Sequence, residues 1–314
     1  MPAAPRVAES RVGVAGSFTG VTTLRPGRQR PSSVNSANAV VVLGEQHRAD
    51  LDRLVDRDPL VNAMAAARLH AARTMRPSRL GATAIGIGGQ NGLDAAAFHG
   101  ANLIPIGGDA ESWRALADYL ACQPRSCSSI VGAAHSVAAL WPPLSVAWGP
   151  ARAIRHQQPL LVRDDVFGLV DDERVRALRP TDIDAYLPAA AAMFTEELGV
   201  SPLEASRSAG YRRRAEHLLE AGRAYGIVDR GRAVVFKADI GALTPHTCQV
   251  QGVWVRPDLR GRGLGTAAMA AVLLRALQLA PTVSLYVNDF NAVARALYGR
   301  LGMRQVAELS TVLY

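Results

Sequence analysis

From Ala39 to the end of the chain, short runs rich in Val, Ile and Leu alternate with longer segments whose apolar residues recur every three or four positions. The short runs predict β-strands, and the longer segments predict helices that bury one face. Strands that alternate with helices are typical of a layered fold in which helices cover the faces of a sheet. This alternation limits the fold more than any other feature. It places the chain in the α/β (α+β) class, with mixed twisted sheets flanked by helices.

The expected elements form two halves with much the same order, separated by a polar break at residues 164–172. In the first half we expect strands at residues 40–43, 82–88, 95–99, 102–106, 129–131 and 159–162, and helices at 50–54, 61–74, 111–122 and 135–140. In the second half we expect strands at residues 175–178, 225–229, 233–240, 249–255, 282–287 and 305–313, and helices at 180–198, 207–221, 263–279 and 291–301. The chain of 314 residues is long for one domain, since domains usually contain roughly 100–150 residues. We therefore predict two domains, at residues 39–165 and 172–314.

Residues 1–38 are rich in Ala, Arg, Ser, Gly and Pro and contain one aromatic residue, Phe18. A segment of this composition cannot bury enough apolar surface to offset the entropy lost on ordering, so we expect a disordered tail. It lacks the continuous apolar core of a secretory signal. No apolar run in the chain reaches the roughly 20 residues that a membrane helix needs. We expect a cytoplasmic protein without a membrane partner.

The formal net charge of +8 raises the question of nucleic-acid binding, since phosphate backbones attract clustered basic residues. The basic residues are almost all arginines scattered along the chain, and Lys237 is the only lysine. They do not gather in a patch with aromatic residues. A basic rim around an anionic cofactor explains the charge at least as well, and we do not expect a nucleic-acid partner.

The three cysteines, Cys122, Cys127 and Cys248, are an odd number, which argues against a disulfide framework. Four residues separate Cys122 from Cys127, but no second pair of Cys or His at zinc-ligand spacing lies near them, and the seven histidines are dispersed along the chain. We therefore expect no metal site.

The segment from Val253 to Thr266 carries the strongest chemical signal. A strand of alternating apolar residues ends at a turn with Pro257, and a loop rich in Arg and Gly then runs directly into a long helix. The first amides of a helix have no partners within it and carry the positive end of its dipole. Glycines allow such a backbone to close around a diphosphate, and Arg260 and Arg262 add positive charge. The segment predicts a binding site for a phosphate-containing cofactor.

The run from Arg260 to Gly265 resembles the cofactor signature of the GNAT acyltransferase superfamily, which is Gln or Arg, two residues, Gly, one residue, and Gly or Ala. Arg260, Gly263 and Gly265 stand at the fixed positions. The same glycines are compatible with a dinucleotide-binding loop, which needs an acidic residue roughly 20 positions further on. Asp289 lies a little beyond that distance, so this alternative stays open on the loop alone.

A second segment resembles the other signature of the superfamily, in which a strand and an Asn precede a helix that contains Ala and Tyr and ends at Leu-Gly-Phe or Leu-Gly-Met. Residues 288–291 precede the helix here, and Gly302 and Met303 follow its last Leu. On this helix, one face is expected to carry Asn291, Arg295 and Tyr298. An apolar stripe expected to pack on the sheet consists of Val293, Leu297 and Leu301. The two signatures in this order favour the GNAT superfamily over the dinucleotide loop.

The resemblance implies a role for individual residues. The CoA pyrophosphate would be held by the backbone amides of Arg260, Gly261, Arg262, Gly263, Leu264, Gly265 and Thr266. The backbone of Trp254 and Val255 would pair with the pantetheine arm, and an amide at residues 253–255 would polarise the thioester carbonyl. Asn291 would also touch the pantetheine arm. Tyr298 would protonate the leaving thiolate, because a thiol with a pKa near ~8.5 leaves poorly without an acid.

The base that deprotonates the attacking amine is less clearly indicated. Many relatives carry a Glu on the strand before the glycine loop, but this strand offers only Gln249 and Gln251. The candidates are Asp239 on the preceding strand and Glu196 or Glu197 near the end of the first helix of the second half. A water chain, or an amine that arrives neutral, is the alternative. Acidic residues in this region would favour a cationic acceptor, and they are Glu196, Glu197 and Glu204.

The first half lacks the loop at the corresponding place. Residues 104–109 contain no Arg and no spaced glycines, and Asp109 and Glu111 would repel phosphate. We therefore expect this half to be a degenerate GNAT-like domain without CoA. The pairing of halves, together with the run at residues 193–200, is similar to an actinobacterial family with a domain of unknown function fused to a GNAT domain.

Two expectations concern packing between the halves. The predicted helix at residues 263–279 is apolar on nearly all sides, and we expect the N-terminal half to cover it or to pack close by. GNAT domains usually end in a two-strand hairpin, but only residues 304–314 follow Met303. The last strand is therefore expected either to be single or to pair with a strand of the other half.

The implied function is that of an N-acetyltransferase. The acetyl group of acetyl-CoA would pass to a primary amine of a protein, peptide, amino acid or small metabolite by direct attack in a ternary complex. Two alternatives stay open. An acyl-CoA-binding regulatory module without turnover is favoured by the missing base, and a nucleotide-dependent oxidoreductase rests on the glycines alone. The oligomeric state is not indicated.

Overall fold

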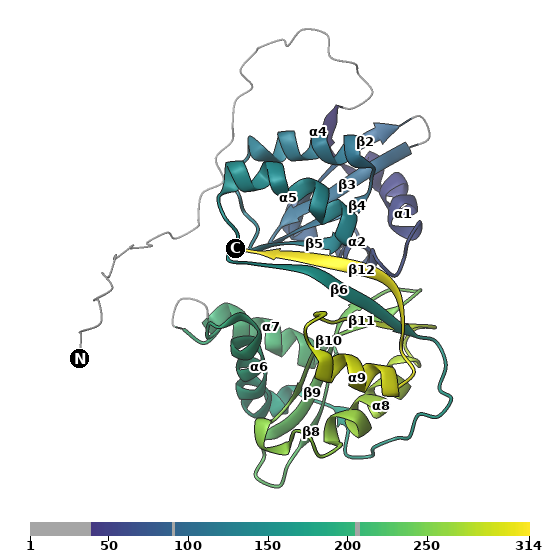
Figure 1. Ribbon diagram of the computed structural model, residues 1–314, viewed down its shortest axis with the longest axis vertical. Coiled ribbons are helices and arrows are strands. Elements are labelled where there is room, and N and C mark those ends of the chain that lie inside the picture. Colours follow the sequence, from purple (N-terminus) through teal and green to yellow (C-terminus); the bar gives the residue numbers. More distant parts are fainter. Residues whose placement is uncertain (1–38, 90–91, 205–207) are drawn as a thin grey trace, which may run out of the picture. The chain divides into compact units, whose positions relative to one another are not determined.

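The computed structural model describes residues 39–89, 92–204 and 208–314, and the predicted disordered tail at residues 1–38 lies outside them. In this part of the chain, twelve strands form one mixed sheet in the order β1-β2-β3-β4-β5-β12-β6-β11-β10-β9-β8-β7, with helices on both faces (Figure 1). The predicted α/β class, with a mixed twisted sheet flanked by helices, is confirmed.

The elements follow the predicted order in each half. The first half contains β1 (Val40–Val42), α1 (Arg48–Asp56), α2 (Ala63–Ala72), α3 (Pro77–Leu80), β2 (Ala82–Gly89), β3 (Gly92–Gly100), β4 (Asn102–Gly107), α4 (Ala110–Ala121), β5 (Ser129–Ala133), α5 (Ala134–Trp148) and β6 (Ala153–Arg163). The second half contains β7 (Arg176–Ala177), α6 (Ile183–Leu198), α7 (Ser208–Glu220), β8 (Ala224–Val228), β9 (Val234–Leu243), β10 (Cys248–Val255), α8 (Leu264–Ala276), β11 (Val283–Tyr286), α9 (Ala292–Arg300) and β12 (Arg304–Leu313).

The two halves have the same topology. In each half, neighbouring strands are antiparallel except for one parallel pair, β4 with β5 and β10 with β11. One helix precedes the second strand of each parallel pair, and these helices are α4 and α8. The short helix α3 is the main element that the sequence pattern does not predict.

The last strands of the two halves are exchanged. Strand β6 of the first half pairs antiparallel with β11, from Val283↔Arg163 to Tyr286↔Leu160. Strand β12 of the second half pairs antiparallel with β5, from Leu309↔Ala133 to Leu313↔Ser129, and also with β6. The expectation that the last strand pairs with the other half is confirmed. The predicted boundary between two domains, at residues 165–172, stays a prediction, because strands from both sides of it belong to one continuous sheet.

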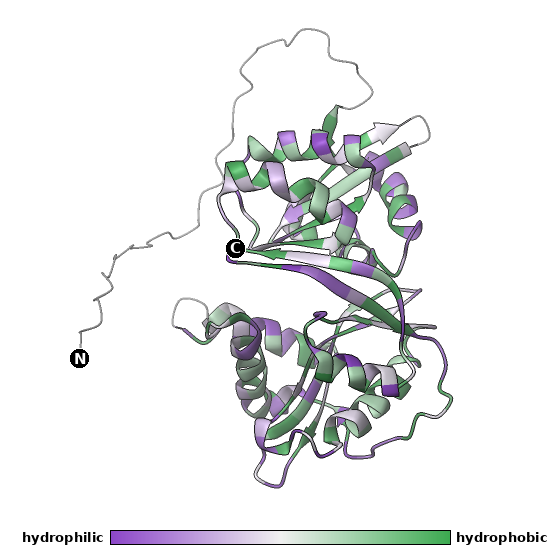
Figure 2. Ribbon diagram, viewed as in Figure 1, coloured by the Kyte–Doolittle hydropathy of each residue, from purple (hydrophilic) through white to green (hydrophobic). Residues whose placement is uncertain are grey.

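Strand β6 begins at Ala153, six residues before its predicted start at residue 159. The hydrophobic pattern misses these first residues because most of them are polar. Residues 155–158 read Arg-His-Gln-Gln and residues 160–162 read Leu-Leu-Val. Figure 2 shows this change along β6 from purple (hydrophilic) to green (hydrophobic). A strand with so polar a beginning carries no apolar alternation, and only its pairing with β12 extends it back to Ala153.

Separate apolar cores lie on the two faces of the sheet. In the first half, α1 and α2 cover one face through Leu54 and Leu69, and α4 and α5 cover the other through Trp113 and Leu140. In the second half, α6 and α7 pack on one face and α8 on the other, and their buried residues form two further cores. Among the helices of the described residues, none is long and apolar enough to cross a bilayer.

The packing of two predicted elements differs in part from expectation. Helix α8 is covered mainly by the sheet of its own half and by the segment between the halves, where Leu169 and Val175 join its core and Asp171 pairs with Arg275 at 2.6 Å. The N-terminal half adds Leu161 of β6 to the same core, so it packs close by and does not cover the helix. Val293 does not pack on the sheet, since it is 81% exposed, whereas Leu297 and Leu301 of the same predicted stripe join the core.

Candidate active site

Strands β10 and β11 part soon after they begin. Their parallel pairing is confined to Cys248↔Val283 and Gln249↔Ser284, although β10 continues to Val255. On its other side, β10 has a bulge between Gln251↔Asp239 and Trp254↔Lys237, where Gly252 and Val253 together oppose one residue of β9. Gly252 has a φ of +60°, which favours glycine. The parted strands and the bulge leave space between β10 and β11.

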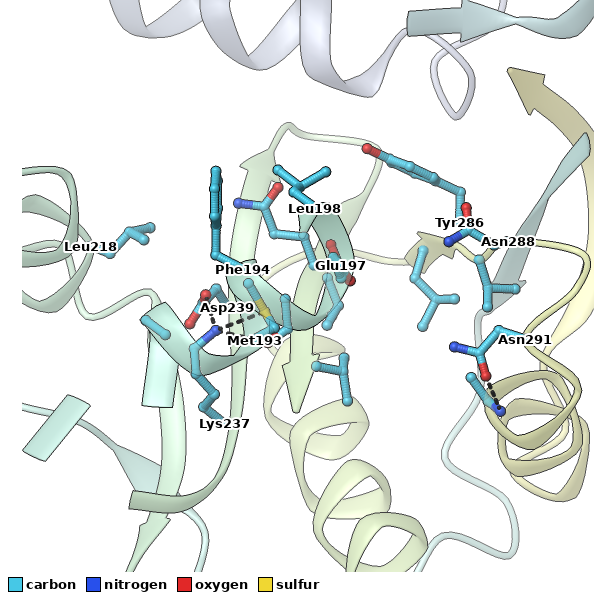
Figure 3. Close-up of a pocket in the computed structure, with 18 of the residues that line it drawn as sticks. Met193, Phe194, Glu197, Leu198, Leu218, Lys237, Asp239, Tyr286, Asn288 and Asn291 are labelled. Atoms are coloured by element: carbon cyan, nitrogen blue, oxygen red, sulfur yellow. Dashed lines mark hydrogen bonds and ion pairs between the residues drawn. The ribbon is translucent and has the colours of Figure 1, made fainter. Parts of the chain in front are cut away.

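A cavity of about 400 Å³ occupies this region. Its walls come from α6, α7, β6, β9, β10, β11 and α9, and they include apolar and aromatic side chains such as Phe194, Leu198 and Leu218. Figure 3 shows Lys237 and Asp239 together on one side of the cavity, and Tyr286, Asn288 and Asn291 on the other. A concave site that combines apolar and aromatic side chains with polar groups is typical of ligand binding.

A buried polar network lies on the β9 side of the cavity. Lys237 has no exposed surface, and its Nζ donates to Asp239 Oδ2 at 2.6 Å and to the Gly252 carbonyl at 2.8 Å. Tyr186 of α6 donates from Oη to the same Asp239 oxygen at 3.0 Å. Because side chains two positions apart lie on the same face of a strand, Lys237 and Asp239 meet directly. The network links β9, α6 and the bulge of β10.

Asp239 has one oxygen to spare. Its Oδ1 is buried and has no hydrogen-bond partner among the described residues, although Oδ2 accepts two bonds. Burial raises the pKa of the Asp239 carboxyl above its ordinary value, and the adjacent Lys237 ammonium acts in the opposite direction. A buried carboxylate oxygen without a partner is costly, so a ligand that donates a proton there would be favoured. Asp239 was one of the predicted bases, and it lines the cavity.

Tyr298 also lines the cavity, from the helix α9. Its side chain is buried, and its hydroxyl forms no hydrogen bond with the described residues. Burial, and to a lesser extent the negative charge of Glu197, raises the pKa of the Tyr298 phenol above its ordinary value. The phenol therefore keeps its proton at neutral pH. Asn291 lies about two turns earlier, where its Oδ1 accepts from the Ala294 amide at 3.1 Å and caps α9.

The predicted cofactor loop has an open backbone. Gly261 and Gly263 have φ angles of +73° and +82°, and no atom lies within 4 Å of a Cβ placed at either residue. Gly263 is the N-cap of α8, so the free amides of the first turn follow it directly. Gly265 has a different reason to be small, because a Cβ there would lie 3.2 Å from Val255 and 3.3 Å from Leu297. The loop geometry fits a phosphate group.

The side chain of Arg260 is used within the protein. Its Nε donates to the Val255 carbonyl at 2.8 Å, and its Nη2 pairs with Glu196 at 2.7 Å. Trp254 donates from Nε1 to the same carboxylate at 3.0 Å. Glu196 thus ties α6 to the end of β10 and does not line the cavity, whereas Glu197 does. The geometry favours Glu197 over Glu196 as the carboxylate that faces a ligand.

The exchanged strand β6 contributes two cavity residues that sequence reasoning missed. Gln158 is buried, donates to Asn288 Oδ1 at 2.8 Å and accepts from Thr311 Oγ1 at 2.6 Å. Arg155 donates to the carbonyl of Glu197 at 3.0 Å. No local pattern links β6 to this site, since only long-range strand pairing brings it there. Lys237 could have been found from its isolation as the single lysine in an apolar strand.

The corresponding place in the first half is closed. Asp109 caps α4 by accepting from the Ser112 amide at 2.9 Å, so its own carboxylate occupies the amides that would meet a phosphate. That hydrogen bond lowers the pKa of the Asp109 carboxyl. The ring of Pro105 on β4 packs against Gly132 on β5, where an added Cβ would lie only 2.8 Å from the ring. In the described part of the chain, no three His, Cys, Asp or Glu side chains could together hold a metal ion.

Comparison with known families assigns the two halves. Residues 194–303 match the acetyltransferase (GNAT) family, and residues 82–186 match a domain of unknown function, DUF4081. The chain therefore contains a GNAT acetyltransferase domain preceded by a DUF4081 domain. No curated protein matches the chain.

Solved structures with the same fold span nearly the whole chain. An acetyltransferase of the GNAT family from Colwellia psychrerythraea is 10% identical with a TM-score of 0.54, and 88% of this chain and 99% of that chain are covered. A GCN5-related N-acetyltransferase-like protein from Streptococcus suis is 13% identical with a TM-score of 0.52, covering 86% and 99%. A tandem GNAT protein from the clavulanic acid biosynthesis pathway is 15% identical with a TM-score of 0.50, covering 88% and 98%. These likenesses show the fold, in which both halves take part.

Proposed function

We propose that residues 172–314 form a catalytic domain that transfers an acetyl group from acetyl-CoA to a primary amine, with residues 39–165 as its degenerate GNAT-like partner. One observation carries this proposal. The strands β10 and β11 part beside the bulge at Gly252, between the open loop at residues 260–266 and the buried Tyr298. This arrangement lies within the segment that matches the acetyltransferase family.

The loop and the first turn of α8 would hold the pyrophosphate of acetyl-CoA. The left-handed glycines Gly261 and Gly263 leave its backbone open to a ligand. Arg262 is exposed beside them and adds positive charge. The edge of β10 at Trp254 and Val255 would pair with the pantetheine arm, beside the amide of Asn291. Acetyl-CoA supplies the acetyl group as an activated thioester.

Three groups of the protein would serve the transfer. Asp239 would accept a proton from the amine through its free Oδ1, which makes the nitrogen lone pair available for attack on the carbonyl carbon. An amide of residues 253–255 would polarise the carbonyl oxygen. As the C–N bond forms and the C–S bond breaks, Tyr298 would give its proton to the sulfur, and the second proton lost by the nitrogen would restore the Tyr298 phenol. The products would be an amide and free CoA.

The cavity favours an amine on an apolar stem. Glu197 and the free oxygen of Asp239 would accept hydrogen bonds from an amine head group, whereas Arg155, Arg214 and Lys237 also line the cavity and balance its negative charge. Around them lie Phe194, Leu198 and Leu218, which would contact hydrocarbon. We further propose a cytoplasmic location, supported by three free cysteines, because a reducing compartment keeps thiols unpaired.

The test is thiol release from acetyl-CoA with a panel of amines and peptides, using the change Tyr298→Phe and the matched control Tyr286→Phe. Both tyrosines line the cavity, so the two variants lose the same atom at different places. We expect the first variant to lower kcat by at least about tenfold, because a positioned acid contributes ~10²–10⁴ to a rate. The control should keep its rate.

Equal rates in the two variants would refute the role of Tyr298. Failure of the wild-type protein to bind acetyl-CoA would refute the proposed function as a whole. Tight binding without thiol release across a broad panel would instead support a regulatory module.

A further inference from the structure

The lysine at position 237 has no role in the transfer described above, yet it is the most completely buried charged side chain at the site. It has no exposed surface and lies on β9 beneath α6, with Nζ 3.6 Å from the sulfur of Met193. Burial of an ammonium group is costly unless it is fully hydrogen-bonded. Asp239 and the Gly252 carbonyl provide those bonds at 2.6 and 2.8 Å.

The bond to Gly252 acts on the part of β10 that has no paired residue on β9. Gly252 and Val253 fall between Gln251↔Asp239 and Trp254↔Lys237, so the ladder with β9 skips them. Without another partner, a peptide group in such a bulge can rotate. The charge-assisted bond from Lys237 fixes it, and bonds of this kind are stronger than neutral ones.

Fixing the carbonyl also fixes the amide of the same peptide unit. The described part of the chain contains no cis peptide bond, and in a trans peptide the C=O and N–H point in opposite directions. Because the Gly252 oxygen points to Lys237 on the α6 side, the Val253 N–H points away from it. Gly252 and Val253 both line the cavity. The orientation of this N–H is therefore set by the lysine, which lines the same cavity.

The surroundings leave little freedom to this arrangement. A Cβ at Gly252 would lie 2.9 Å from both Lys237 Nζ and Asp239 Oδ2, so only glycine allows the lysine to approach the backbone. Tyr186 binds Asp239 from α6 and places its ring 5.4 Å from Nζ. The lysine is held by its neighbours and in turn holds the bulge.

We infer that Lys237 is a positioning residue that orients the Gly252–Val253 peptide so that the Val253 N–H polarises the carbonyl of a bound acyl thioester. The inference rests on the proposed function, because it assumes that the thioester lies against the bulge. It adds a second residue of β9 to the site, beside Asp239 of the same strand. A preoriented donor is effective because it needs no reorganisation during the reaction.

The test uses acetyl-CoA labelled with ¹³C at the carbonyl carbon, bound to the full-length protein, because the carbonyl resonance reports polarisation without any turnover. The perturbation is Lys237→Met, which keeps the length of the side chain and removes its charge and donors. Thr247→Val is the control, since Thr247 is also fully buried and bonded to Ser284 Oγ at 3.0 Å, but lies at the far end of the parted strands. A second variant, Lys237→Gln, is neutral but retains a donor.

We expect a downfield carbonyl shift on binding to the wild type and to the control, and its loss in Lys237→Met. With an amine acceptor, kcat should fall at least tenfold in Lys237→Met while KM for acetyl-CoA changes less than threefold. Lys237→Gln should recover part of both effects. If acetyl-CoA bound to Lys237→Met has the same carbonyl resonance as acetyl-CoA bound to the wild type, the inference about Lys237 is overturned, while the proposed function stands.

Other outcomes are equally decisive. If the wild-type protein binds no acetyl-CoA, the proposed function and this inference fall together. If neither lysine variant folds while the control does, the lysine is a structural residue only, and the positioning role is refuted.

Discussion

Replacing Gly252 by Ala is the sharpest test of the packing at the bulge. The new methyl group meets two separate penalties. The φ of +60° places an L-residue in the left-handed region, which costs roughly 1–2 kcal/mol. The added Cβ would also lie 2.9 Å from Lys237 Nζ and 2.9 Å from Asp239 Oδ2, and overpacking of a close-packed site costs about 1–3 kcal/mol. The sum is a loss of roughly 2–5 kcal/mol in the free energy of unfolding.

Gly222→Ala separates the two penalties. Gly222 follows α7 and has a nearly identical φ of +64°, but no atom lies within 4 Å of a Cβ placed there. This variant should lose only the backbone contribution of about 1–2 kcal/mol. Urea unfolding followed by circular dichroism gives both free energies, and their difference measures the contact with the lysine and the carboxylate. If Gly252→Ala lost no more stability than Gly222→Ala, the close approach of Lys237 to the backbone would be refuted.

Three further predictions concern the acidic residues and the connection between the halves. Glu197→Gln should raise KM for a cationic acceptor, whereas Glu196→Gln should leave that KM unchanged in thiol-release assays; the reverse result would restore Glu196 as the cavity carboxylate. A protease recognition site can be introduced at Phe167, which is 88% exposed. After cleavage there, the two fragments should elute as one particle on native gel filtration and separate only in denaturant. Separation under native conditions would contradict the exchange of strands. The Asp182 carboxyl has a pKa lowered to about 2, first by hydrogen bonds from Arg176, so it stabilises the fold above its ordinary value of 3.8, and this contribution is lost as the pH falls through about 2. Asp182→Asn should therefore lower the free energy of unfolding by about 1 kcal/mol at pH 7, after allowance for solvent screening, and match the wild type near pH 2 in acid titrations. A constant difference across this range would contradict the assignment.

The features that the sequence predicted best depend on residues that are close together in the chain. Gly261 and Gly263 adopt left-handed backbone in the predicted cofactor loop, and the order of strands and helices follows from hydrophobic periodicity. Asn291 and Tyr298 share one side of α9 and both line the cavity, as their spacing indicates. Arg295 does not join them, since its guanidinium donates to the Asp289 carbonyl. Local spacing determines the face of a helix but not the reach of each side chain.

The features that sequence missed depend on residues far apart in the chain. Gln158 reaches the cavity only because β6 leaves its own half, and nothing within residues 153–163 indicates which strand they join. The sequence shows Lys237 only as the single lysine of the chain. Its contact with the bulge at Gly252, fifteen positions later, is visible only in the structure. Glu196 and Glu197 are adjacent in sequence, but the ion pair with Arg260 draws one of them away from the cavity.

The exchange of β6 and β12 also limits how this protein can be recombined. Multidomain proteins commonly arise by joining segments at linkers, and a break near residue 168 would be the natural place here. A transplanted second half would lack the strand that lies beside β11, together with Gln158 and Arg155. A foreign domain inserted in its place would leave β5 without β12. The first half has no open loop at the place where Asp109 caps α4, yet it supplies β6 to the second half, so we expect the two halves to be inherited only as a pair.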